Sequence, residues 1–192
     1  MKNNKHRSKI SGILLIALMT VVLTSCGAKK AGTAEEFAAM SQRVQEGELR
    51  IVAEAAYPGN TYASQQVLNS VLRGTGDTAN RIDLAGDGYY VQLSPERVQA
   101  NLPFYGERRQ GGGYGTVNDA GIQFDVEPTE YSLIKEEDRY RYRIKFDADK
   151  GIENFDTEVI LFANGTAIIY VISSTRTRME YRGRVVDAVD VE

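Results

Sequence analysis

The sequence predicts a mainly β protein: an antiparallel β-sandwich or partly closed barrel of about eight strands, with one N-terminal helix. From residue 81 to residue 181, short runs of alternating apolar and polar residues recur at fairly regular spacing, with turn residues between them. Asn164-Gly165 stands between two apolar runs, which is a strong hairpin signal. Clear helical periodicity is confined to the front of the chain.

One amphipathic helix is predicted over residues 34–46. Thr33 and Glu36 form a capping box, in which each side chain accepts a hydrogen bond from the other residue's backbone amide. Gly47 closes the segment. The apolar face is expected to comprise Phe37, Met40 and Val44.

The next segments are short and divided by turns. A strand is predicted from residue 48 to residue 54, where the apolar period changes to two. Tyr57-Pro58-Gly59-Asn60 has turn chemistry. Residues 63–72 fit either a helical stripe or a strand.

Two more strands, residues 81–85 and 89–93, flank Gly86-Asp87-Gly88, which predicts a tight hairpin. A short helical turn is predicted at Ser94-Pro95-Glu96, because proline suits the first helical position. Residues 101–115 have no periodicity.

The second half of the chain is predicted to be all strand. Residues 139–146 alternate strictly between basic and apolar or aromatic, as in a half-buried antiparallel strand. Gly183 is expected to end the last strand, and residues 187–192 to form a frayed tail. The expected strands are residues 121–126, 130–135, 139–146, 155–162, 167–173 and 177–181.

The N-terminus is typical of a secreted, lipid-anchored protein. Residues 1–9 are basic without an acid, and the uncharged run 10–22 is shorter than the roughly 20 residues of a membrane span. Leu23-Thr24-Ser25-Cys26 resembles the lipobox of bacterial lipoproteins. We expect residues 1–25 to be a signal peptide, Cys26 to carry the lipid, and residues 26–32 to be a flexible tether before one β-rich domain, residues 33–192. The alternative is an ordinary signal peptide with a stray cysteine.

The amino-acid composition excludes several classes of function. Removal of the signal leaves 19 basic and 26 acidic residues, so an acidic domain with a net charge of about −7 is expected to bind no nucleic acid. His6 is the only histidine and Cys26 the only cysteine. A mature chain without histidine or free thiol cannot run a Ser-His-Asp or Cys-His mechanism or build the usual zinc site. No cofactor and no metal is expected; the calcium-loop resemblance of Asp147–Gly151 lacks ligands at key positions.

Several motifs together resemble one family. They are Leu102-Pro103-Phe104-Tyr105-Gly106 with the glycine-rich run after it, Gly121-Ile122-Gln123-Phe124, Asn164-Gly165-Thr166-Ala167 and Ser173–Gly183. In order and spacing they look like the DUF4251 family of lipoproteins from Bacteroidetes-type bacteria, over residues 37–185. The resemblance implies an envelope location and no particular reaction.

The aperiodic loop is the main candidate for ligand binding. Its aromatic and arginine side chains suit stacking on a sugar or clamping a carboxylate. Alternatively, Leu102 and Phe104 fill the end of the core and Gly106 takes a positive φ. The candidate ligand-binding residues are Phe104, Tyr105, Arg108, Arg109 and Tyr114.

Two basic rows are further candidates. On a strand, Arg176, Arg178 and Arg182 share one face and form a possible anion-binding row, unless acids neutralise them. The second row, Arg139 to Lys145, suits lipid headgroups or peptidoglycan, or simply a charged sheet surface.

We therefore expect a non-enzymatic envelope lipoprotein that binds an unidentified envelope ligand or protein partner. No acidic cluster follows Cys26, which favours the periplasmic face of the outer membrane. One alternative is a glycan hydrolase with paired carboxylates drawn from Glu107, Asp119 and Asp125. Another is a purely structural envelope lipoprotein.

Overall fold

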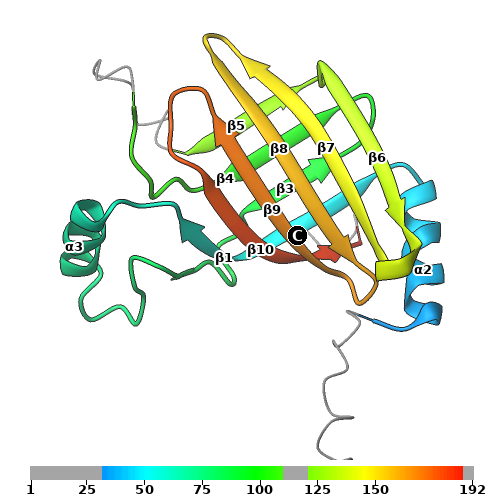
Figure 1. Ribbon diagram of the computed structural model, residues 1–192, viewed down its shortest axis with the longest axis horizontal. Coiled ribbons are helices and arrows are strands. Elements are labelled where there is room, and N and C mark those ends of the chain that lie inside the picture. Colours follow the sequence, from blue (N-terminus) through cyan, green and yellow to red (C-terminus); the bar gives the residue numbers. More distant parts are fainter. Residues whose placement is uncertain (1–31, 110–120, 188–192) are drawn as a thin grey trace, which may run out of the picture. The chain divides into compact units, whose positions relative to one another are not determined.

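The computed structural model describes residues 32–109 and 121–187, which belong to one unit of the chain, Ala31–Glu192. This part consists of one curled antiparallel sheet and two α-helices (Figure 1). The helices are α2 (Ala34–Gln45) and α3 (Tyr62–Val71), with a 3-10 turn η2 (Glu137–Arg139). The strands are β1 (Leu49–Pro58), β2 (Ile82–Asp83), β3 (Tyr90–Leu93), β4 (Val98–Leu102), β5 (Ile122–Val126), β6 (Glu130–Glu136), β7 (Arg141–Lys150), β8 (Glu153–Phe162), β9 (Thr166–Ser173) and β10 (Met179–Val186).

Two meanders joined by the first strand make up the sheet. Its order is β5-β4-β3-β1-β10-β9-β8-β7-β6, and β2 extends the pairing of β1 beyond β3. β1 lies between β3 and β10, so the start and the end of the folded chain are hydrogen-bonded to each other.

The two edge strands, β5 and β6, are consecutive in the chain and are separated only by residues 127–129. So short a link forces the sheet to curl until its edges approach each other, and β6–β9 lie in front of β3–β5 in Figure 1. The Lys150 Nζ atom donates to the carbonyl of Gln123 at 2.8 Å across the gap. The result is a half-barrel, which confirms the expected mainly β, partly closed architecture.

A single core fills the inside of the curled sheet. Alternate residues of β7 and β8 point inward and are buried, among them Phe146 and Phe155. The ring of Phe124, from the opposite half, lies 6.1 Å from Phe146 and 5.3 Å from Phe155 between ring centroids. Burying each such side chain contributes about 1.5–3 kcal/mol.

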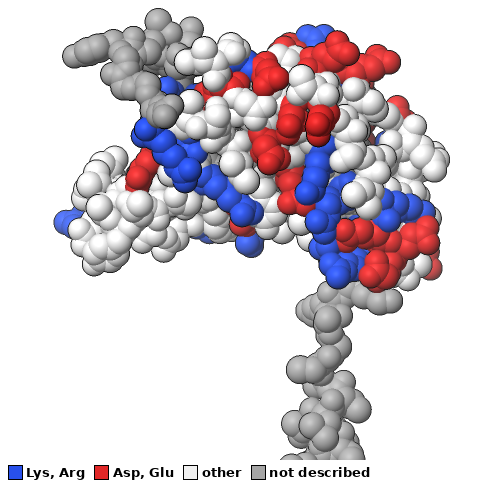
Figure 2. Space-filling model, turned by 45° about the horizontal axis from the view of Figure 1, so that its top comes forward, with Lys and Arg blue, Asp and Glu red and all other residues white. Residues whose placement is uncertain are grey.

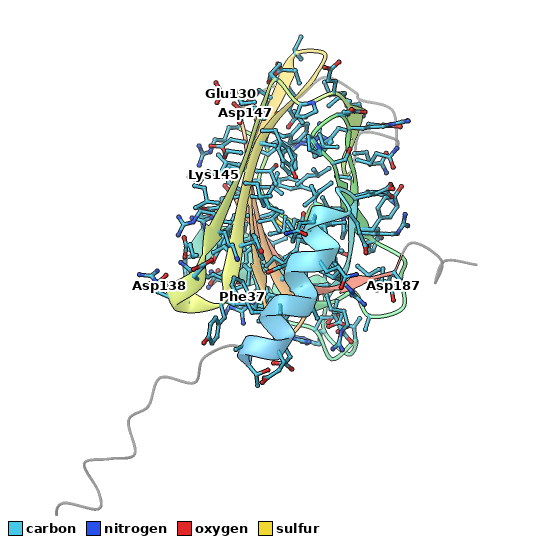
Figure 3. All side chains as sticks on the ribbon, turned by 90° about the vertical axis from the view of Figure 1, so that its right-hand side faces the viewer. Phe37, Glu130, Asp138, Lys145, Asp147 and Asp187 are labelled. Carbon is cyan, nitrogen blue, oxygen red and sulfur yellow. The ribbon has the colours of Figure 1, made fainter. Side chains whose placement is uncertain are left out.

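Helix α2 covers the opening between the two halves, as Figure 3 shows. Its capping box of Thr33 and Glu36 is present, as predicted. Phe37 contacts the rings of Tyr140 and Tyr142, both at 5.4 Å between centroids. The expected apolar face of Phe37, Met40 and Val44 is the buried one.

Several local expectations were wrong. Gly86-Asp87-Gly88 does not close a hairpin, because β2 and β3 both pair with the same edge of β1 and not with each other. The strand expected over residues 81–85 shortens to Ile82–Asp83. Ser94-Pro95-Glu96 forms no helical turn; it is part of the tight β3–β4 connection, in which the Ser94 amide donates to the carbonyl of Arg97 at 3.0 Å.

Other segments are now assigned. Residues 98–102, expected in part as aperiodic chain, are strand β4, and residues 62–71 are helix α3, one of the two readings left open. Gly183 does not end a strand, because β10 continues to Val186. Asn164-Gly165 does form the β8–β9 hairpin, with Gly165 at a φ of 81°.

The expected signal peptide (residues 1–25), the lipidation site Cys26 and the tether up to Ala31 lie outside the described residues. So does nearly all of the expected tail. Among the residues that are described, no helix has the length and apolarity to cross a bilayer.

Candidate functional site

The backbone after β4 lies along the turn between β9 and β10. The amide of Arg109 donates to the carbonyl of Thr175 at 2.7 Å, and the amide of Thr177 donates to the carbonyl of Glu107 at 2.9 Å. The Thr177 hydroxyl accepts from the Glu107 amide at 2.9 Å. Residues 107–109 are therefore held like a short strand against residues 175–177.

A buried ion pair lies beneath this contact. The guanidinium of Arg176, which is 4% exposed, donates to both carboxylate oxygens of Glu153, at 2.7 and 2.9 Å. Its remaining nitrogen, Nη1, donates to the carbonyl of Gly121 at 2.8 Å. Arg176 thus joins the turn, the start of β8 and the residue before β5.

Two hydroxyl groups also donate hydrogen bonds to the carboxylate of Glu153. Thr175 Oγ1 donates to the carboxylate at 2.9 Å, and Ser173 Oγ donates to the same oxygen. Burial opposes ionisation of Glu153, but the hydrogen bonds from Arg176, Ser173 and Thr175 outweigh it and lower the pKa of the carboxyl. Glu153 is therefore ionised at neutral pH, as a bidentate partner of arginine requires.

The aromatic residues of the loop are attached to the core. Phe104 and Tyr105 pack against it from the outside, and the Arg176 guanidinium lies 5.1 Å from the Phe104 ring centroid. Gly106 does not have the expected positive φ. It is required for space, because a Cβ there would lie 2.2 Å from Thr177 Oγ1 and 2.8 Å from the Phe104 ring.

Glu107 binds the N-terminus of helix α3. Its Oε1 accepts from the amide and the hydroxyl of Thr61, at 3.2 and 2.6 Å, and from the Ser64 hydroxyl. The hydrogen bonds of Ser64 and then of Thr61 lower the pKa of Glu107, and a negative charge suits this end of a helix. The loop thereby fixes the base of α3 as well.

The expected anion-binding row is divided by the fold. Arg176 points inward to Glu153, whereas Arg178 and Arg182 are exposed on the outer face. The Arg178 guanidinium lies 4.2 Å from the Tyr170 ring centroid, and that of Arg182 lies 4.5 Å from Tyr57. Arg108 and Arg109 are exposed nearby, and Arg108 forms an isolated bridge with Arg176. Tyr114 lies outside the described residues.

The family model of a domain of unknown function, DUF4251, matches residues 31–185. The chain belongs to the DUF4251 family. A crystal structure of a DUF4251 family protein from Bacteroides eggerthii DSM 20697 is similar at a TM-score of 0.52 and 10% identity, covering 82% of this chain and 91% of that one. At this identity the likeness shows the fold alone. No curated protein matches the chain.

On this DUF4251 domain the second basic row is largely neutralised. Glu136 binds Arg141 and Arg143, and Glu158 binds Arg143 at 3.2 Å. Arg139 does not belong to the strand; it lies in η2 beside Asp138.

Further along β7 the outer face becomes acidic. Glu130, Asp147 and Asp156 are direct cross-strand neighbours on β6, β7 and β8, with Asp149 two residues away. Figure 2 shows acidic side chains gathered where the β7–β8 hairpin comes forward. Burial, then Asp156, Glu130 and Asp149, raise the pKa of Asp147. The described residues contain no cluster of three or more His, Cys, Asp or Glu side chains arranged to hold a metal ion.

The replacement Asp147→Asn should therefore stabilise the protein at neutral pH. Because the pKa of Asp147 is raised by folding, ionisation costs the folded state stability above the folded pKa, and the cost disappears at pH values below the unfolded pKa of about 3.9. Screening at this partly exposed site limits the gain to a few tenths of a kcal/mol. Thermal melting at pH 7 should show a higher midpoint for the variant than for the wild type. At pH 3.5 the two midpoints should be equal. Asp87→Asn, in a turn, is the matched control; an equal gain there would contradict the assignment to cross-strand repulsion.

Two of the three carboxylates considered for a hydrolase, Glu107 and Asp125, already accept hydrogen bonds from neighbouring side chains. Asp125 accepts from Arg97 at 2.6 and 2.7 Å, and the hydrogen bond from Arg97 lowers its pKa. The pKa of Glu107 is lowered as well. A glycosidase acid needs a raised pKa, so this pair does not supply one. Asp119 lies outside the described residues.

The fold brings together what the sequence placed in two separate candidates, the loop at Phe104–Arg109 and the arginine at position 176. Glu153, Thr175 and Thr177 were missed. Glu153 lies 23 residues before Arg176, and nothing in the local pattern shows that this acid turns inward at the start of a strand.

Proposed function

We propose that this DUF4251 protein is a lipid-anchored envelope protein without catalytic activity, which binds a ligand or partner at the surface of Phe104, Tyr105, Arg108 and Arg109. The observation that carries the proposal is the clasp formed by residues 175–177. That turn holds the backbone at Glu107 and Arg109, and Arg176 holds the carbonyl of Gly121. The turn therefore holds both Arg109 and Gly121.

A binding surface that is already ordered avoids the conformational-entropy cost of ordering a loop when the ligand binds. Here a buried ion pair and several hydrogen bonds hold the backbone at Glu107, Arg109 and Gly121.

The exposed arginines beside the clasp favour an anionic group on the ligand. The mature chain would carry a net charge of about −7, yet Arg108, Arg109 and Arg178 are exposed together beside the clasp. The planar guanidinium group suits bidentate contact with a carboxylate or phosphate.

A lipid anchor at Cys26 would determine how far the domain lies from the membrane. A lipid at Cys26 would stand seven residues before Thr33, the N-cap of α2. An extended chain of that length spans at most about 25 Å, so the domain would stay close to the membrane surface. The periplasmic face of the outer membrane remains the proposed location.

Two measurements test the proposal. Radiolabelled palmitate should label the full chain but not its Cys26→Ser variant, and that variant should leave the membrane fraction. In co-sedimentation with phosphatidylglycerol vesicles, whose phosphates are the probe, Arg108→Gln/Arg109→Gln should lose about tenfold in affinity, or about 1.4 kcal/mol. Arg73→Gln/Arg81→Gln is the charge-matched control. Absence of label, equal binding by both double variants, or substrate turnover abolished by the loop variant would contradict the proposal.

A further inference from the structure

The outer face of the β3–β5 half differs from the rest of the sheet surface. Alternation along the three strands points six side chains outward. They are Tyr90, Gln92, Gln99, Asn101, Gln123 and Asp125. Four of the six are carboxamides. The outward positions of β7 in the other half are all charged: Arg141, Arg143, Lys145, Asp147 and Asp149.

The six side chains form two cross-strand rows. Tyr90, Asn101 and Gln123 are direct neighbours, as are Gln92, Gln99 and Asp125. In Figure 3 the labelled Lys145 and Asp147 lie on the β6–β8 half, and the β3–β5 half lies across the core from them. The amide-rich rows therefore face solvent on the opposite side of the molecule from the charged ones.

These rows line two hollows. One, of about 540 Å³, is lined by Tyr90, Gln99, Asn101, Gln123, Asp125 and Lys150, among others. The second, of about 370 Å³, includes Gln92, Gln99 and Arg97. Gln99 lines both, so the two hollows adjoin and form one shallow, open surface. No residue of Phe104–Arg109 lines either hollow.

The larger hollow offers the carboxamides of Gln99, Asn101 and Gln123 and the aromatic side chain of Tyr90. Among the described residues, the Tyr90 hydroxyl makes no hydrogen bond, and the Asn101 amide makes only one, by accepting from Gln123 at 3.2 Å. Arg50 covers one side of the Tyr90 ring, 3.8 Å from its centroid, and does not line the hollow. Two charged groups also line the hollow: Asp125 is paired with Arg97, and Lys150 Nζ donates to the carbonyl of Gln123.

We infer that this face binds a neutral carbohydrate. A sugar hydroxyl is both donor and acceptor, and a carboxamide likewise offers both on one planar group. A carboxylate only accepts and an ammonium only donates. The free-energy cost of removing water from an amide when a ligand binds is also smaller than the cost for a charged group. The aromatic ring of Tyr90 supplies apolar area for the C–H face of a sugar ring.

The experiment uses two neutral oligosaccharides, because the sugar could come from an amino-sugar polymer such as peptidoglycan or from a plain hexose polymer. Chitohexaose and maltoheptaose are titrated into the folded domain and followed by calorimetry and by the side-chain amide signals in NMR. At least one is expected to bind, and the one that binds identifies the source. Binding by neither at about 10 mM would overturn the inference.

Variants locate the site. Tyr90→Ala and Asn101→Ala/Gln123→Ala should each lose about tenfold in affinity, and Tyr90→Phe should lose less because the ring remains. Gln66→Ala, an exposed amide on α3, is the control and should bind as the wild type does. Arg108→Gln/Arg109→Gln should also keep sugar binding, which separates this site from the loop. Unchanged affinity in a variant of the face that melts like the wild type would overturn the inference.

Discussion

Replacing Arg176 with alanine is expected to cost about 3–5 kcal/mol of unfolding free energy, because the change leaves the Glu153 carboxylate buried without its cation. The Glu153 side chain is 15% exposed, and among the described residues it would keep only the hydroxyls of Ser173 and Thr175 as donors. The carbonyl of Gly121 and the ring of Phe104 would also lose their partner. Urea unfolding of the variant and the wild type measures the loss.

The pH dependence separates this effect from simple loss of packing. The pKa of Glu153 is lowered in the folded state, so the stability contributed by the pair is present above the unfolded pKa of about 4.3 and is lost as the pH falls through the folded pKa. The difference between Arg176→Ala and the wild type should therefore shrink in acid. Arg182→Ala, which removes an exposed ion pair with Glu180, should cost less than about 1 kcal/mol. A difference that stays constant from pH 7 to pH 3 would contradict the ion-pair account.

The replacement Gly183→Ala is expected to cost about 3 kcal/mol, which for a domain of this size lowers the melting midpoint by roughly 10 °C. A Cβ at residue 183 would lie 1.9 Å from the carbonyl oxygen of Val52 and 3.0 Å from the Cα of Ala53. Both are backbone atoms of β1, next to the irregular pairing between Ala53 and Ala55, so they cannot move aside without breaking the β1–β10 register.

The control for that variant is Gly47→Ala. Gly47 has open space around a Cβ but a φ of 84°, so alanine there should cost only about 1 kcal/mol through backbone strain. Thermal melting of the two variants should differ accordingly. Equal losses would show that collision with β1 is not the cause at residue 183.

Much of the fold could be predicted because its signals are local. The capping box at Thr33, the alternation of β7 and the turn at Asn164-Gly165 each depend on a few neighbouring residues. Predictions failed where the partner of a segment is distant. Gly86-Asp87-Gly88 has hairpin chemistry, but β1 binds both flanking strands and so prevents them from pairing with each other.

The candidate site shows the same division. Phe104 and the arginines were found because aromatic and basic residues cluster in the sequence, whereas Glu153 was missed because its partner Arg176 lies 23 residues away in the chain. The amide rows on β3–β5 were missed because each strand contributes only two residues, and the rows exist only in the paired sheet.

The amino-acid sequence by itself determined the β class, the front helix, the family and the expectation of a lipid anchor, since each is encoded in short-range patterns of charge, apolarity and turn residues. Only the tertiary structure decided that the sheet curls into a half-barrel, that Arg176 turns inward to hold the loop, and that carboxamides gather on one outer face. The physical reason is that strand order, burial and the pairing of charges depend on contacts between residues far apart in the chain, which no local pattern specifies.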